Sequence, residues 1–253
     1  MPIVTLSTKT YAETQPNLVE HLVKSMLNGL DVKAEVTQVS DNGWVQASIS
    51  GDDQDVALRF LEEQVGFALE GFQQVRKFST TKAYVTHFNR SRLFFDAGIS
   101  SQKGVEVSAS LGNLQAQLVD GRKMALERIA EIYGLVEHLP MKVKILAVHE
   151  ESRHIEITLS EEQLALYRNW TSGVLDRLTV LGSTANEVKS AIRDSGCCRD
   201  LVEIDSIGLF EHVIACKLGT DAAGLIPKIG RRLPRARFSV FSPRRTMQFL
   251  GHF

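Results

Sequence analysis

The first third of the chain alternates between apolar and polar residues in short stretches. This period of two is typical of strands with one buried face, and it runs through residues 3–11, 32–40 and 44–50. The last two stretches flank Asp41-Asn42-Gly43, a strong hairpin signal. Apolar residues recur at helical spacing in residues 16–29 and 53–66. The order β-α-β-β-α predicts a small α+β domain over residues 1–72, with both helices on one face of the sheet.

The middle of the chain contains shorter strands separated by Gly, Asn and Ser. Five segments have the strand pattern, namely residues 82–88, 92–98, 103–110, 141–151 and 153–160. One helix is expected between Gly121 and Gly134. Five short strands with a helix ahead of the last hairpin predict an OB-type β-barrel over residues 73–160.

From Ser160 onward the apolar spacing is helical again. Residues 160–178 predict a long helix with Ser160 as its N-cap and acidic residues in its first turn. Further helices are expected at residues 186–196 and 222–233, and strands at residues 201–207, 211–218 and 237–241. We therefore expect a C-terminal α/β domain over residues 161–253, and a multidomain α+β protein overall.

Composition places the chain among ordinary globular proteins. With 253 residues, 43% of them hydrophobic and 23% charged, it is long enough for two or three compact domains. No apolar stretch approaches the ~20 residues of a membrane-spanning helix, and the N-terminus lacks the pattern of a signal peptide. The odd count of three cysteines argues against a disulfide framework. These features predict a cytoplasmic protein that does not enter a membrane.

Candidate catalytic and metal motifs are weak. His149 and His154 are five residues apart, whereas a zinc-protease helix needs a spacing of four. The glycine-rich residues 218–230 lack the Lys-Ser/Thr ending of a phosphate loop and the glycine spacing of a dinucleotide site. His212 and Cys216 fall on one face of a predicted strand and are interpreted as core residues. We expect no metal, no cofactor and no enzymatic activity.

Charge is distributed very unevenly along the chain. The formal net charge is −1, but residues 1–72 carry 4 basic and 11 acidic side chains, and residues 228–253 carry 7 basic and none acidic. Such asymmetry is typical of a surface that faces a polyanion, although a solvated face is the plainer reading. The pattern of Phe238, Val240 and Phe241 inside the basic run predicts a buried strand, which argues against a nuclear targeting signal.

The central strands carry a family resemblance. Residues 80–98 and 141–160 resemble the two ends of the RNA-binding OB domain repeated in the largest bacterial small-subunit ribosomal protein. Its Phe-rich strand and Asp-x-Gly are matched by Phe94, Phe95, Asp96 and Gly98, and its closing hairpin by Lys142 to Ser160. Two of the family's stacking positions are absent, before the first turn and on the third strand. The resemblance implies base stacking on Phe94, whereas Arg90 and Arg92 suggest phosphate contacts in place of the absent aromatic residues. Lys142 and Lys144 complete the predicted RNA contacts of the barrel.

The chain as a whole resembles an archaeal family catalogued only as a conserved domain of unknown function. The three-part layout and residues 207–234 carry this resemblance. It implies an archaeal cytosolic protein with a central RNA-binding-type OB domain, and it brings no known active site.

These observations predict a non-catalytic RNA-binding protein that acts on structured RNA such as a ribosomal subunit. Besides the five barrel residues, the predicted contacts lie in the basic run, namely Lys228, Arg231, Arg232, Arg235, Arg237, Arg244 and Arg245. Six of these seven are arginines, which suit bidentate contacts to phosphates and bases. Two alternatives remain open. One is a protein-interaction module of the transcription or translation apparatus, with the acidic N-terminal domain docking on a basic partner; the other is an RNA-processing enzyme with an unrecognised site.

Overall fold

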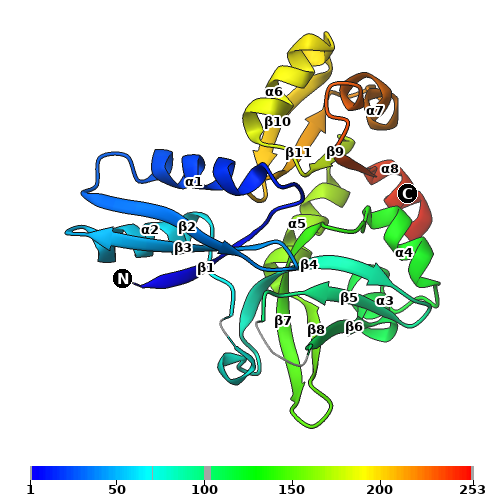
Figure 1. Ribbon diagram of the computed structural model, residues 1–253. Helices are drawn as coiled ribbons and strands as arrows, with labels where there is room; N and C mark the ends of the chain where they lie inside the picture. Colours follow the sequence, from blue (N-terminus) through cyan, green and yellow to red (C-terminus); the bar gives the residue numbers. More distant parts are fainter. Residues whose placement is uncertain (1, 70, 100–103, 252–253) are drawn as a thin grey trace.

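The computed structural model describes residues 2–69, 71–99 and 104–251 (Figure 1). Its strands form a three-stranded sheet, a closed five-stranded barrel and a four-stranded sheet, in that order along the chain. The predicted multidomain α+β fold with a five-stranded barrel is thereby confirmed. No helix in the described ranges is both long and apolar enough to cross a membrane.

The N-terminal sheet has the predicted β-α-β-β-α order. Its elements are β1 (Ile3–Lys9), α1 (Gln15–Met26), β2 (Val32–Val39), β3 (Trp44–Gly51) and α2 (Gln54–Gln64). The strands pair antiparallel in the order β1-β3-β2. Leu6, Val45 and Ile49 face both helices and form one buried cluster with them, so the helices cover one side of the sheet as expected. The opposite side of the sheet faces the barrel, where the Tyr84 hydroxyl donates to the Ser7 carbonyl at 3.1 Å.

The central barrel closes through five strands. They are β4 (Thr80–Phe88), β5 (Arg92–Asp96), β6 (Glu106–Ser110), β7 (Pro140–His149) and β8 (His154–Leu159), and their order around the barrel is β4-β5-β6-β8-β7. The β6–β8 pair is parallel and the other pairs are antiparallel. Lys103, where the third strand was expected to begin, lies outside the described residues.

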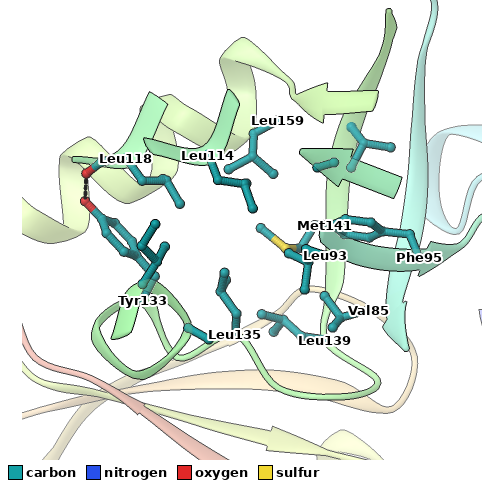
Figure 2. Close-up of a cluster of buried hydrophobic side chains, with 14 of the residues drawn as sticks. Val85, Leu93, Phe95, Leu114, Leu118, Tyr133, Leu135, Leu139, Met141 and Leu159 are labelled. Carbon is teal, nitrogen blue, oxygen red and sulfur yellow. Dashed lines mark hydrogen bonds between the residues drawn. The ribbon is translucent and has the colours of Figure 1, made fainter. Parts of the chain in front are cut away.

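Two helices, rather than the single one predicted, separate β6 from β7. They are α3 (Leu111–Leu118) and α4 (Leu126–Tyr133). Ser110 caps α3 by accepting from the Asn113 backbone N–H, and α4 starts at Leu126 instead of near Gly121. Side chains from both helices close the barrel core in Figure 2, where the Tyr133 hydroxyl donates to the Leu118 carbonyl.

The C-terminal part differs from the prediction at both of its ends. The helix expected over residues 160–178 is shorter, because α5 (Glu161–Ser172) ends before Gly173, and its last two expected residues begin β9 (Arg177–Leu181), a strand that was not predicted. After β12 (Arg237–Phe241) the chain forms an additional helix, α8 (Pro243–Leu250). Pro243 occupies the first turn of α8, where a missing N–H has no cost.

The four-stranded sheet is antiparallel throughout, so this part is α+β rather than the expected α/β. Its remaining elements are α6 (Ala185–Asp194), β10 (Leu201–Ser206), β11 (Glu211–Cys216) and α7 (Ala222–Gly230). The strand order is β10-β11-β9-β12. His212 and Cys216 are buried, as predicted for core residues. Phe238 and Val240 are only half-buried against α7, whereas Phe241 is fully buried.

The C-terminal part packs against both other parts. Leu209 and Phe210, in the turn between β10 and β11, lie within the N-terminal core cluster. Phe241 and Leu250 belong to the barrel cluster. The C-terminal part therefore contributes buried side chains to the cores of both other parts.

Candidate nucleic-acid interface

An aromatic pair lies on the outer surface of the barrel. Side chains alternate along β5, so Leu93 and Phe95 point into the core while Arg92 and Phe94 point outward. Phe94 is half-buried and pairs in register with His87 of β4. The two rings stack with centroids 4.4 Å apart and planes only 9° apart. This stacked pair presents a flat π surface next to β6.

Arg92 is held beside the aromatic pair by two neighbouring strands. Its Nη1 donates to Ser108 Oγ at 2.9 Å and lies 3.3 Å from His154 Nε2, which is itself 2.9 Å from Ser108 Oγ. Burial, and then the Arg92 charge, lowers the pKa of His154 below its usual value, so this ring is neutral at pH 7. Within the described part of the chain, Nη2 and Nε of Arg92 form no hydrogen bond, and they are free for a ligand.

The turn between β4 and β5 places a second arginine at the same end of the barrel. Asn89 Oδ1 accepts from the backbone N–H of Ser91 at 2.9 Å and of Arg92 at 2.8 Å, which fixes the turn. Arg90 lies exposed at its tip. The predicted residues Arg90, Arg92 and Phe94 therefore lie together on one hairpin.

A cleft of about 870 Å³ runs between this surface and the N-terminal sheet. Trp44 and Gln46 line it from β3, and His87, Phe94 and Glu106 line it from the barrel. A partly buried ion pair, Lys9 Nζ to Asp96 Oδ2 at 2.7 Å, joins the two walls. Because Asp96 neutralises Lys9 and further carboxylates line the cleft, its interior is not positive. Positive charge lies instead at the arginine hairpin.

The other two predicted barrel residues lie elsewhere. Lys142 and Lys144 project from β7, which neighbours β4 and β8 but neither β5 nor β6. Lys142 forms an exposed ion pair with Glu162 of α5. The structure thus does not bring these lysines together with Arg90, Arg92 and Phe94.

All seven cations of the basic run are exposed, but they form two separate groups. Lys228, Arg231, Arg232 and Arg235 lie at the end of α7 and in the loop after it, and Arg237 begins β12 and pairs with Glu137. Arg244 and Arg245 lie in the first turn of α8, where no helix was predicted.

The helix dipole stabilises one group of cations and destabilises the other. Cations at the end of α7 are favourable there, so the fold alone accounts for them. Cations in the first turn of α8 oppose the positive end of the helix dipole by about 0.3–1 kcal/mol each. Local helix stability therefore does not explain Arg244 and Arg245.

Two residues of the barrel surface were not predicted. His87 was within an expected strand, and its partner Phe94 indicates its role only once the β4–β5 register is known. His154 was considered solely as a zinc ligand, whereas it lies across β6 from Arg92. The alternation of apolar and polar residues along β8 predicts that His154 faces outward, and this pattern could have identified it from the sequence.

Comparison with solved structures gave several distant likenesses. An uncharacterized protein from Methanocaldococcus jannaschii is 16% identical, with 35% of this chain and 96% of that chain covered and a TM-score of 0.25. The intact alpha subunit of aIF2 from Pyrococcus abyssi is 9% identical, with 66% and 97% covered and a TM-score of 0.26. A chain of the a/eIF2alpha-aDim2p-rRNA complex from Pyrococcus horikoshii OT3 is 12% identical, with 48% and 64% covered and a TM-score of 0.27. TM-scores this low establish neither a shared fold nor a shared function.

Comparison with curated proteins gave no match. The match to a protein family, in contrast, extends over most of the chain. Residues 3–68 match the DUF2110 N-terminal domain, residues 78–171 the DUF2110 central domain, and residues 175–241 the DUF2110 C-terminal domain. The three matches follow one another in the order of the family, and the chain belongs to the DUF2110 family.

Proposed function

We propose that this protein binds RNA on the outer surface of its barrel, acting in the cytoplasm without catalysing a reaction. The observation that carries the proposal is the stacked pair His87–Phe94 with Arg90 and Arg92 beside it. Stacking on aromatic rings combined with cations along the backbone is the general mode of single-strand recognition. The resemblance of the same hairpin to the RNA-binding OB domain of the largest bacterial small-subunit ribosomal protein supports this proposal.

The topology of the barrel supports the same surface. Its strand order and its parallel β6–β8 pair are those of an OB-fold, whose second and third strands bind oligonucleotides. In this chain those strands are β5 and β6, and they carry Phe94 and Ser108. We infer that bases enter the cleft of mixed charge while phosphates follow the arginine hairpin.

Alanine substitution at the aromatic pair tests the proposal. We expect Phe94→Ala to lower the affinity for single-stranded RNA by about 1–3 kcal/mol, a roughly 5- to 150-fold weaker Kd. Fluorescence anisotropy with a labelled oligouridine measures this. Leu218→Ala is a matched control, because Leu218 is exposed but lies on the C-terminal part. If the wild type and Phe94→Ala bind the oligouridine with equal affinity, this surface is not the RNA-binding site.

We further propose that the physiological RNA is structured and belongs to the translation apparatus, with a ribosomal subunit as the partner. The two exposed arginine groups near α7 and α8 support a large, highly charged ligand. Co-sedimentation of the full chain with purified ribosomal subunits tests this assignment. If the protein binds RNA but does not co-sediment with ribosomal subunits, the proposed RNA site on the barrel stands and the ribosomal subunit is rejected as the partner.

A further inference from the structure

A second aromatic side chain is displayed on the other side of the barrel. Phe78 lies between a short 3-10 helix, Phe72–Gln74, and β4, and it is 61% exposed. Its backbone is left-handed, with φ of +69°, a conformation that is uncommon for a bulky side chain. The apolar ring is thus largely exposed to water, and its backbone conformation is unfavourable. Neither burial of the side chain nor backbone preference explains why a phenylalanine occupies this position.

The backbone around Phe78 is fixed to the barrel. The Phe78 N–H donates to the Ile145 carbonyl at 2.8 Å, and the Ile145 N–H donates to the Ser79 carbonyl at 2.9 Å. Ser79 Oγ donates to the Arg76 carbonyl at 2.7 Å. These bonds continue the β4–β7 ladder beyond Thr80, and they fix the backbone that carries the ring.

Cations surround the ring. Lys77 Nζ lies 5.0 Å and Lys144 Nζ 5.6 Å from its centroid, and Arg76 is exposed next to them. Among the described residues no carboxylate lies within 4.0 Å of either lysine. Lys142, on the same face of β7, does pair with an acid, Glu162. Positive charge around Phe78 is therefore left unneutralised.

We propose that Phe78 is a stacking platform for one unpaired RNA base, with Lys77, Lys144 and Arg76 holding the adjacent phosphates. The ligand class rests on the function proposed above, but the site is a separate one, because it lies on the β4–β7 side and not on β5 and β6. An isolated ring among cations fits a base joined to phosphates. A membrane contact would need further apolar residues, and the neighbours Gln73, Gln74 and Thr80 are polar and exposed.

One RNA strand of sufficient length can bind at Phe78 and at the His87–Phe94 pair at the same time. Phe78 and His87 lie at opposite ends of β4, nine residues apart, which corresponds to roughly 30 Å. A long oligonucleotide can reach both aromatic sites, whereas a very short one can occupy only one at a time. Loss of Phe78 should therefore affect long oligouridine more than short oligouridine.

The decisive experiment compares three substitutions at this position, using anisotropy with labelled oligouridine. Phe78→Ala should weaken binding of the long oligonucleotide about 5-fold or more, and Phe78→Tyr should retain it. Phe78→Gly should weaken binding equally while the melting temperature stays the same or rises, because glycine accepts the left-handed backbone. A crosslink from 4-thiouridine RNA to Phe78 in the wild type, mapped by mass spectrometry, is expected as well.

The outcomes separate the two proposals. Normal affinity of Phe78→Ala together with weak binding of Phe94→Ala would overturn the platform and leave the barrel site intact. No RNA binding by the wild type would overturn both. Binding of labelled polyglutamate to the wild type but not to Phe78→Ala, together with normal RNA affinity of that variant, would identify the site as one for acidic peptides and would also overturn the platform.

Discussion

The carboxyl group of Glu211 is completely buried between residues of all three parts of the molecule. Its Oε1 accepts from the Tyr11 hydroxyl at 2.7 Å, and Oε2 has no hydrogen-bond partner among the described residues. Burial raises the pKa of Glu211 to about 7, and Lys82 on β4 only partly opposes this increase. The folded state therefore holds a proton on Glu211 that the unfolded chain releases near pH 4.5.

This raised pKa predicts a pH dependence of stability. A group whose pKa is higher in the folded state contributes its full stability below the unfolded value and loses it as the pH rises through the folded value. The free energy of unfolding should thus fall between pH 4.5 and about 7 through Glu211, by up to about 3 kcal/mol. Glu211→Gln should remove this decrease, and it should melt at a higher temperature than the wild type at pH 8.

Thermal denaturation followed by circular dichroism from pH 4.5 to 8 measures the effect. Tyr11→Phe is a useful companion, because it removes a side-chain hydrogen bond that favours the charged form and should make the decrease larger. Parallel pH curves for the wild type and Glu211→Gln would mean that Glu211 does not titrate in this range.

At the scale of single elements, α8 offers a matched comparison with α7. Replacing Arg244 and Arg245 together by alanine should weaken RNA binding and lower the salt slope by about two units. The same change should leave stability unchanged or raise it by about 0.3–1 kcal/mol per residue, because these cations oppose the helix dipole. Replacing Arg231 and Arg232 removes cations from a favourable helix end, and should lower stability slightly.

Salt titrations of RNA affinity and chemical denaturation of both double variants measure these effects. If the variant with alanine at both Arg244 and Arg245 binds RNA with the wild-type salt slope, these two arginines do not contact RNA and form a solvated face.

Elements with strong local signals were predictable from the sequence. The Asp41-Asn42-Gly43 turn and the Ser160 cap each depend on a few adjacent residues. The missed elements are short: β9 has five residues, and α3 and α8 have eight each. β9 is a central strand between β11 and β12, so its apolar run has no alternation and continues the helical pattern before it. α8 starts at Pro243, a residue that disfavours a helix interior but is tolerated in the first turn.

The candidate site was predictable only in part, for a related reason. Arg90, Arg92 and Phe94 are near neighbours in sequence, and the resemblance marked them together. The His87 and His154 contacts depend on strand register around the barrel, and Lys144 approaches Phe78 only through the β4–β7 pairing. Such pairings between distant residues cannot be inferred from local patterns.

At the scale of the whole molecule, the β10–β11 turn is one of the contacts that join the N-terminal and C-terminal parts. Phe210 comes from the C-terminal sheet, but its fully buried ring lies in the N-terminal core cluster. Gln15 Nε2 adds a hydrogen bond to the Gly182 carbonyl at 2.9 Å. Unfolding of the N-terminal part therefore exposes side chains of the C-terminal part as well.

This arrangement predicts that Phe210→Ala destabilises both parts together. Truncating a buried phenylalanine costs about 3–5 kcal/mol, and here the cavity forms in the N-terminal core cluster while the β10–β11 turn loses its buried side chain. Amide hydrogen exchange of the full chain should therefore accelerate in β1, β3 and β11 alike, whereas exchange in β5 and β6 should change less. Phe60→Ala is the control, because Phe60 lies exposed on α2 and its loss should leave all five strands protected. Faster exchange confined to β11 would show that the N-terminal part is stable without the hairpin, and that the N-terminal and C-terminal sheets are energetically independent.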